Sequence, residues 1–361
     1  MNERLRPLRV LPNPVRRPQF GAGTLVAPFR ESQDAAPAAE DWTASDVRPR
    51  SATPGEETGL GRVRLSPDET ATVADLIAAD PEGMLGRDHL GRWGTRLGFL
   101  AKIFDPDRRI PIHCHPTRDF AREHFGSPVG KTEAWIVLAD SGISPNAWIG
   151  FRDDVTEERW CELVDAQDGG ILAALNPVTL RAGDVLVVPA GNPHSLGPGL
   201  LVIEPQEACD WSFLAEYAAY GVSRSNAELG LGTEAALSAF ARTRLDPAAV
   251  EERLITRGAL QDAPDGVTPL APAGRPFFAA DVLRTRSRLT VAATGPRVLV
   301  AIAGTGTVIG GGCTEEVRPG DVFFLPGGVP SVTIAARDDA LTIASIGAGD
   351  TPPAQNPENP S

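Results

Sequence analysis

The chain has 361 residues, more than one compact core usually holds, so we expect two domains or one body with two cores. Apolar residues make up 42% and charged residues 22%, which indicates a folded globular protein and excludes a disordered one. With 47 acidic and 34 basic residues the net charge is −13, so neither phosphate backbones nor anionic lipids attract the chain. Nucleic-acid and membrane-surface binding are therefore not expected.

The two ends of the chain are rich in proline. We expect extended tails at residues 1–18 and 348–361, and an exposed loop in the polar stretch 34–57. Apolar residues at helical spacing predict helices at 69–79 and 210–241. Short apolar runs bounded by Gly, Pro or Asp predict β-strands at 98–104, 134–138, 185–188, 200–203, 298–302 and 322–325. Short strands at such spacing are typical of a β-sandwich or β-barrel.

The first residues also bear on location. The N-terminal run MNERLR lacks the apolar block of a secretory signal, and no run of about 18 apolar residues follows. We therefore expect a cytoplasmic protein. The four cysteines lie far apart without C-x-x-C spacing, so neither a disulfide framework nor a thiolate zinc site is expected.

A repeat links two distant parts of the chain. Residues 181–194 read RAGDVLVVPAGNPH and residues 318–331 read RPGDVFFLPGGVPS, an offset of 137 residues without a gap. Two related β modules are therefore expected to flank a helical segment. The second copy has Ser331 where the first has His194, as expected if one module binds a ligand and the other has lost it.

Three of the five histidines are spaced like metal ligands. His113 and His115 lie two residues apart, so on a strand both side chains leave the same face, about 7 Å apart. Glu133 opens a predicted strand, and His194 follows the turn PAGNP. Three imidazoles and one carboxylate predict a catalytic site for Zn, Fe, Mn or Ni. The other two histidines are expected to be ordinary surface or core residues.

These motifs resemble a known family. The Gly, Pro, Gly and His at positions 183, 189, 191 and 194 follow the second motif of cupin barrels. Together with IHCHP at 112–116, GKTEAW at 130–135 and EPQE at 204–207, they resemble class I mannose-6-phosphate isomerases, as a divergent member of the short bacterial type. The resemblance implies a mainly β fold of two cupin-type jelly-roll β-barrels. It also implies one divalent metal ion, with Zn²⁺ favoured.

The resemblance carries site residues over to this chain. The metal ligands of the family correspond to His113, His115, Glu133 and His194, with His113 at a position usually held by Gln. Imidazole is a competent metal ligand there.

Two lysines of the family's site correspond to Lys102 and Lys131. They are the only lysines of the chain, whose other 32 basic residues are arginines, and we expect both to bind substrate. For the transfer of a proton in catalysis the candidates are Lys131 and Glu207.

The sequence departs from the family at two places that bear on phosphate binding. The run DWSFL at 210–214 lacks an arginine that short bacterial members carry, and Pro111 replaces a serine found in some members. Arg118, Arg122 or Arg224 are candidates to supply the missing charge.

The implied function is a metal-dependent aldose–ketose isomerase of carbohydrate metabolism that interconverts mannose 6-phosphate and fructose 6-phosphate. The alternatives are an isomerase of another, non-phosphorylated sugar, a non-catalytic sugar- or metal-binding cupin, and a metal-dependent dioxygenase with the same ligand set. The expected division is a metal-binding catalytic cupin domain at 19–209, a helical segment at 210–262 and a second, metal-free cupin-like domain at 263–347. The expected partner is a small sugar phosphate.

Overall fold

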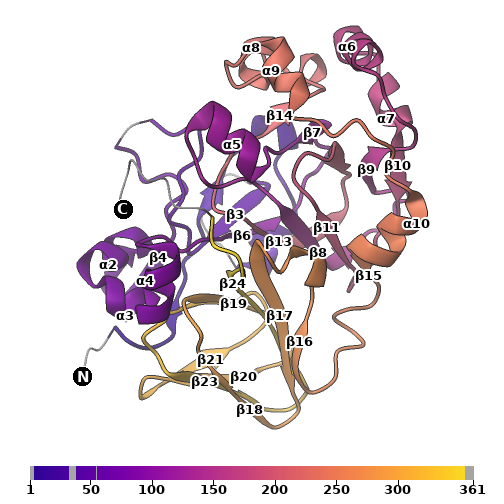
Figure 1. Ribbon diagram of the computed structural model, residues 1–361. Helices are drawn as coiled ribbons and strands as arrows, with labels where there is room; N and C mark the ends of the chain where they lie inside the picture. The colour runs from indigo at the N-terminus through magenta and orange to yellow at the C-terminus, as the bar shows by residue number, and fades with distance from the viewer. Residues whose placement is uncertain (1–3, 32–37, 54, 354–361) are drawn as a thin grey trace.

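The structure is a computed structural model that describes residues 4–31, 38–53 and 55–353. Parts of the two expected tails and of the expected loop at 34–57 lie outside these residues. The described chain is mainly β and forms two β-sandwiches, one below the other in Figure 1. The predicted fold class is confirmed, as two-sheet sandwiches of the jelly-roll kind.

The first sandwich contains the middle of the chain. Its larger sheet has the strand order β15-β11-β8-β13-β6-β3-β2 and its smaller sheet the order β10-β9-β12-β7-β14. The larger sheet consists of β2 (Pro14–Val15), β3 (Glu40–Thr43), β6 (Leu100–Phe104), β8 (Glu133–Asp140), β11 (Val185–Val188), β13 (Leu200–Gln206) and β15 (Ile255–Thr256). The smaller sheet consists of β7 (His113–Cys114), β9 (Ala147–Phe151), β10 (Leu175–Val178), β12 (His194–Leu196) and β14 (Phe213–Leu214).

The second sandwich is made mainly by the C-terminal part. Its sheets have the orders β1-β22-β19-β24-β17-β16 and β18-β23-β20-β21. The first sheet consists of β1 (Leu8–Arg9), β16 (Gly266–Pro269), β17 (Phe278–Thr285), β19 (Arg297–Ala303), β22 (Val322–Leu325) and β24 (Leu341–Ala348). The second consists of β18 (Arg288–Ala292), β20 (Gly306–Gly310), β21 (Cys313–Val317) and β23 (Ser331–Ala336).

The internal repeat is visible in the strand order. The four central strands β11-β8-β13-β6 correspond to β22-β19-β24-β17, and β10-β9-β12-β7 correspond to β21-β20-β23-β18. The turn before β11 matches the turn before β22: Gly183 and Gly320 have φ values of 90° and 89°. The carboxylates of Asp184 and Asp321 each accept a hydrogen bond of 3.0 Å from the backbone N–H three residues earlier. The prediction of two related β modules is therefore confirmed.

The larger sheets of the two sandwiches lie back to back. Side chains alternate between the faces of a strand. On β8, Trp135 faces the interior of the first sandwich and Ile136 enters a core shared by both sandwiches. On β19, Leu299 likewise faces the interior of the second sandwich, and Val300 enters the shared core. Because both faces are buried, these strands are continuously apolar, which is why short apolar runs located them.

The N-terminal segment ties the two sandwiches together. Strand β1 pairs with β22 of the second sandwich and β2 with β3 of the first. The buried guanidinium of Arg30 donates to Asp41 (2.7 Å), to the carbonyl of Val10 (3.1 Å) and to the carbonyl of Gly320. Residues 8–9 and 14–15, expected as part of an extended tail, are thus extended but paired in sheets.

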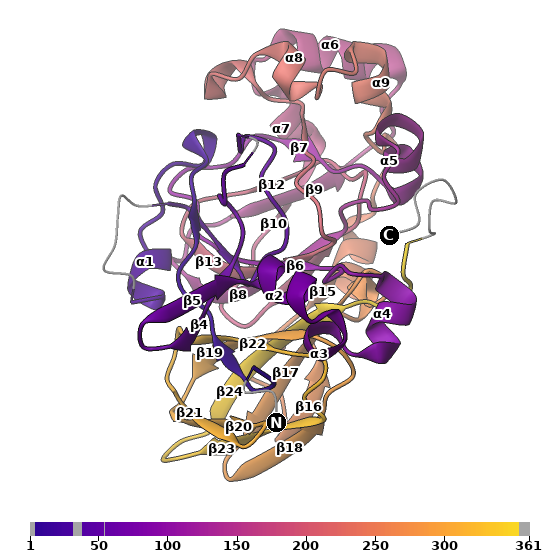
Figure 2. The same ribbon diagram turned by 90° about the vertical axis from the view of Figure 1, so that its left-hand side faces the viewer.

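Helices lie beside the two sandwiches and at the far end of the first one (Figures 1 and 2). Next to the junction are the hairpin β4 (Arg62–Ser66) and β5 (Glu69–Thr72) and the helices α2 (Val73–Ala79), α3 (Pro81–Leu85) and α4 (Arg87–Trp93). The other α-helices are α1 (Val26–Phe29), α5 (Arg118–Phe125), α6 (Glu157–Ala166), α7 (Gly170–Ala174), α8 (Arg224–Ala227), α9 (Thr233–Ser238) and α10 (Pro247–Ala249). Among the described residues, no helix is long and apolar enough to span a bilayer.

Both predicted helices are shorter than expected. In the segment 69–79 the first four residues pair with β4, and the helix begins only at Val73, where the hydroxyl of Thr72 accepts from the N–H of Asp75 (3.0 Å). The segment 210–241 contains β14, a 3₁₀ turn at Ala218–Tyr220 and the short helices α8 and α9. Glycines with positive φ at 221, 230 and 232 interrupt it, a conformation that no continuous α-helix allows.

The shared core predicts that the two sandwiches unfold together. Ile203 is fully buried in it, so Ile203→Ala should lower the free energy of unfolding by about 2–5 kcal/mol through lost burial and a cavity. Urea unfolding followed by fluorescence should show a single transition at a lower midpoint. Val267→Ala, at a side chain that is 49% exposed, is the control and should change little. Two separate transitions would contradict a shared core.

Candidate metal centre and adjoining cavity

Sheet pairing brings three histidines together inside the first sandwich. His113 on β7 and His194 on β12 are direct partners in the antiparallel register, and their ring centroids are 4.1 Å apart. His115 follows β7 on the same face. One ring nitrogen of each of the three lies within 4.8 Å of the others, and all three side chains are buried. These are the three histidines that the sequence predicts as ligands.

The backbone fixes the orientation of each imidazole. Every Nδ1 lies 2.8 Å from a carbonyl oxygen, contributed by Pro111 for His113, Trp211 for His115 and Asn192 for His194. Because a carbonyl oxygen only accepts, each ring is held with Nδ1–H donating and with the lone pair of Nε2 available. This is the arrangement by which proteins orient histidine ligands for a metal.

A carboxylate completes the group of donors. Glu133, the first residue of β8, places its two oxygens 3.1 Å from Nε2 of His115 and 3.4 Å from Nε2 of His194. Among the described residues, the buried Nε2 of His194 has no hydrogen-bond partner. The ammonium of Lys131 lies 2.7 Å from Glu133 and 2.8 Å from Nε2 of His115. A partnerless buried lone pair next to a carboxylate fits a bound cation.

The protonation states also suit a cation. Burial and the neighbouring imidazoles hold the pKa of His113 well below its usual range, and burial with the charge of Lys131 lowers the pKa of His115 to about 3. Burial acts to raise the pKa of Glu133, but Lys131 and His115 outweigh it and hold that pKa well below normal. At neutral pH His113 and His115 are therefore neutral and Glu133 is ionised. Three nitrogens and one oxygen form a donor set that Zn²⁺ accepts.

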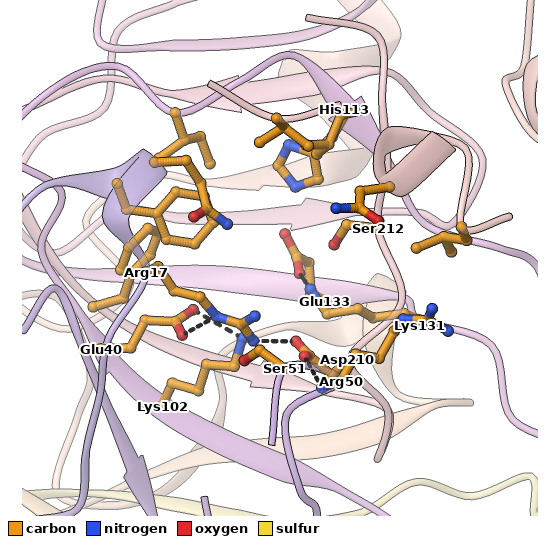
Figure 3. A pocket seen from close by; sticks show the side chains of 18 of the residues that line it. Arg17, Glu40, Arg50, Ser51, Lys102, His113, Lys131, Glu133, Asp210 and Ser212 are labelled. Carbon is orange, nitrogen blue, oxygen red and sulfur yellow. Dashed lines mark hydrogen bonds and ion pairs between the residues drawn. The ribbon is translucent and has the colours of Figure 1, made fainter. Parts of the chain in front are cut away.

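A cavity of about 500 Å³ adjoins this cluster (Figure 3). Two of the predicted ligands, His113 and Glu133, and both predicted lysines are part of its wall. Four basic and four acidic side chains line it: Arg17, Arg50, Lys102 and Lys131 against Glu40, Glu133, Glu204 and Asp210.

Most of these charges are paired with one another. Lys102 donates to Glu40 (3.2 Å) and to Glu204 (3.0 Å), and Arg17 donates to Glu40 (3.2 Å) and to Asp210 (2.5 Å). Although burial opposes it, the two carboxylates raise the pKa of Lys102, so its ammonium stays charged. Lys102, predicted from the sequence to bind substrate, thus lies on the cavity wall at the centre of a buried ionic network.

Glu204 differs from the other acidic groups of the cavity. Burial, followed by repulsion from Glu133, raises its pKa, and the attraction of Lys102 and Lys131 does not offset this. Its carboxylate lies 4.0 Å from the ammonium of Lys131. A buried carboxyl with a raised pKa in a cavity is a candidate for proton transfer.

The structure places Glu207 elsewhere. Its carboxylate accepts from the N–H of Thr132 (3.0 Å) and from Arg118 (2.6 Å), and it is not part of the cavity wall. Glu207 therefore holds the loop that leads into Glu133. The prediction of Glu207 as a proton-transfer group is not supported by this position, although it lies only three residues after Glu204.

The arginines proposed to contact phosphate also lie outside the cavity wall. Arg118 is engaged by Glu207, Arg122 by Asp119, and Arg224 by Glu228 and by Asp165. Leu214, in the run that lacks the family arginine, lines the cavity and pairs with His113 across β14 and β7.

Several residues of the cavity were missed in the sequence. Arg17 lies in the segment expected as a tail, and Glu40 and Arg50 lie in the stretch expected as an exposed loop. No motif marks them. The one available signal was Trp42, a large aromatic residue in an otherwise polar stretch, whose indole N–H donates to Glu40 (3.0 Å).

Two sandwiches of equivalent strand order give the chain a two-module cupin fold, and one module carries a buried cluster of three histidines and a carboxylate that could hold a metal ion. A scan against known protein families gives no match. In sequence the chain is 27% identical over 235 residues to a mannose-6-phosphate isomerase of Streptococcus mutans, covering 64% of this chain and 69% of the relative. The resemblance seen in the motifs is therefore confirmed.

Solved structures agree on the fold. The mannose 6-phosphate isomerase of Bacillus subtilis superimposes with a TM-score of 0.69 at 20% identity, covering 94% of this chain and 99% of that one. A mannose 6-phosphate isomerase bound with zinc and yttrium gives a TM-score of 0.67 at 15% identity, with coverages of 95% and 99%. The likeness thus includes both sandwiches.

The cluster predicts one metal site per chain. His194→Ala removes a nitrogen whose lone pair has no other partner, so the metal content of the purified protein should fall from about one ion per chain to near zero. Elemental analysis and the thermal midpoint with and without chelator measure this. His124→Ala, on α5 outside the cluster, is the matched control and should keep the metal. Full metal content in the His194 variant would disprove the site.

Proposed function

We propose that this protein is a metal-dependent aldose–ketose isomerase that interconverts mannose 6-phosphate and fructose 6-phosphate. The observation that carries the proposal is the cavity beside the histidine cluster, whose wall holds His113, Glu133, two lysines and the raised-pKa carboxyl of Glu204. The sequence similarity to a mannose-6-phosphate isomerase supports the same substrate.

The reaction transfers a proton between C1 and C2 of the sugar, so it needs a base and a way to stabilise negative charge on the substrate oxygens. His113, His115, Glu133 and His194 would hold the metal, which as a Lewis acid supplies that stabilisation. We assign the proton transfer to Glu204, because its raised pKa brings it nearer to neutral pH. The ammonium of Lys131 would orient a substrate oxygen beside it.

Replacing the two nearby glutamates distinguishes these roles. Glu204→Gln removes the proposed base and should lower kcat by about 100-fold or more, while the metal content stays the same. Glu207→Gln, at a side chain outside the cavity wall, should keep most of the activity. Steady-state kinetics and elemental analysis on both variants measure this. A larger loss in the Glu207 variant would instead favour the assignment made from the sequence.

The phosphate group needs a cation that is not already paired. Among the described residues that line the cavity, Arg17, Lys102 and Lys131 are bound to carboxylates, whereas the guanidinium of Arg50 has no carboxylate partner. The backbone N–H of Arg50 donates to Asp210 (2.9 Å), which holds this loop against the cavity, and Ser51 adds a hydroxyl. We assign phosphate binding to Arg50 and Ser51, because arginine binds phosphate oxygens with paired donors.

Loss of Arg50 should therefore weaken binding more than turnover. For Arg50→Ala we expect KM for mannose 6-phosphate to rise about tenfold or more, with kcat changed much less. The exposed Arg64 on β4 is the matched control, and Arg64→Ala should leave both constants unchanged. Equal KM values in the two variants would refute the assignment.

The overall proposal is tested by incubating the metal-loaded protein with mannose 6-phosphate and measuring fructose 6-phosphate. Turnover should disappear with chelator and in His194→Ala, and persist in His124→Ala. Turnover of mannose but not of its phosphate would identify an isomerase of free sugars. Sugar binding without proton exchange at C2 would identify a non-catalytic cupin, and consumption of oxygen a dioxygenase.

A further inference from the structure

The second sandwich contains a cavity of its own. Its volume is about 500 Å³, and it opens between β16, β18 and the interior faces of β17, β19 and β24. Its polar lining comprises Arg275, Asp281, Thr294, Arg297 and Ser345. Volumes of this order are common for small-molecule sites.

Strand registers show that this cavity corresponds to the metal-binding cavity. Val188 of β11 pairs with Glu133, and Leu325 of β22, 137 residues later, pairs with Arg297. Arg297 therefore occupies the position of the carboxylate ligand Glu133.

The neighbouring strands give the same alignment. Gln206 of β13 pairs with Glu133, and Gly347 of β24 pairs with Arg297. Two residues earlier, Glu204 pairs with Lys102 and Ser345 pairs with Asp281. Asp281 therefore occupies the position of Lys102, and Ser345 that of Glu204.

The histidine positions have changed as well. His194 pairs with His113 in the first sandwich, and Ser331 pairs with Ala292 in the second. The interior face of these two strands is carried by the neighbouring pair Val291 and Val332, and Val332 rather than Ser331 lines the cavity. Among the described residues, no histidine lines this cavity. At the position of the carboxylate Glu133 it has the guanidinium of Arg297.

The side chain of Arg297 is held in the cavity. A Cβ atom added at Gly347 would lie 2.6 Å from Cδ of Arg297, so the arginine lies across this glycine. Its guanidinium is 3.3 Å from the carboxylate of Asp281 and 3.4 Å from the hydroxyl of Thr294. Burial lowers the pKa of Arg297, and the attraction of Asp281 does not offset this.

A second guanidinium reaches the same carboxylate. Arg275 donates to Asp281 (3.2 Å), and its Nε donates to Asp350, whose side chain is 64% exposed at the rim. The charged groups that line the cavity itself are two guanidiniums and one carboxylate. Each guanidinium carries five N–H donors, so Asp281 leaves several of them for another oxyanion.

The rest of the wall is apolar. The apolar wall is one side of the packed core of this sandwich, formed by Leu283, Val291, Leu299, Leu325 and Val332. The ion pair of Arg297 with Asp281 lies on the wall of the same cavity.

We propose that the second sandwich binds a small organic anion, with its carboxylate or phosphate group on Arg297 and Arg275 and an apolar body against the leucine and valine side chains. Carboxylate and phosphate share the paired geometry that a guanidinium recognises. The site is separate from the cavity of the proposed isomerase reaction and does not depend on that proposal.

The test is isothermal titration with 4-bromobenzoate and 4-bromophenyl phosphate. For at least one probe we expect binding that Arg297→Met weakens about tenfold or more, while the isomerase activity and the metal content stay unchanged. The metal-binding cavity contributes equally to both proteins, so the difference reports the second sandwich. Arg288→Met, at an exposed arginine on β18, is the matched control and should bind as the unaltered protein does. Which probe binds decides between carboxylate and phosphate.

A second measurement does not depend on a variant. In crystals of the unaltered protein soaked with either probe, anomalous scattering should place bromine between β17, β19 and β24. Bromine found only in other places, or equal affinities of the unaltered protein and Arg297→Met for both probes, would overturn the proposal.

Discussion

The structure depends on one constraint, the burial of both faces of the two larger sheets. In β8, β13, β17 and β19 one set of side chains must fill its own sandwich while the alternate set fills the layer between the sandwiches. A shift of one residue in any register would exchange these sets, so the registers are strongly fixed. The same registers determine which residues reach the cavities. Packing of the shared core therefore places Glu133 among the histidines and Arg297 in the equivalent position of the second module.

This coupling explains why duplication left two cavities with opposite chemistry. A position that faces the interior of a jelly roll is defined by the backbone, and the side chain there can change without disturbing the shared layer. At the position of Glu133 the second module has an arginine, and at the position of Lys102 it has an aspartate. Each module therefore has one acidic and one basic side chain at these two positions, in opposite places. The fold is thus retained, and the kind of ion that each interior can accept is reversed.

Much of the fold and of the metal centre could be predicted from sequence, because both rest on local patterns. Strands such as β11 and β22 are short apolar runs, and the His-x-His pair and the Pro-x-Gly turn place their side chains by backbone geometry alone. The remainder depends on contacts between distant segments. Arg17 and Glu40 come from a stretch without periodicity and meet Asp210 only after folding. Glu207 and Glu204 look alike in sequence, and only the pairing of β13 shows that one faces the cavity and the other the loop before β8.

The course of the first thirty residues has a consequence for synthesis of the protein. Strand β1 has its partner in β22, more than 300 residues later, while Arg17 from the same segment forms part of the cavity wall. On the ribosome this segment emerges first, yet it has no complete place to bind until almost the whole chain has been made. We expect the cavity to close late in folding, after a contact of very high sequence separation has formed. A nascent chain that stops before β22 would already contain all four proposed metal ligands. It could therefore bind its ion before it has a finished pocket for substrate, and hydrogen exchange in such a truncated chain would show whether residues 8–17 are still unprotected.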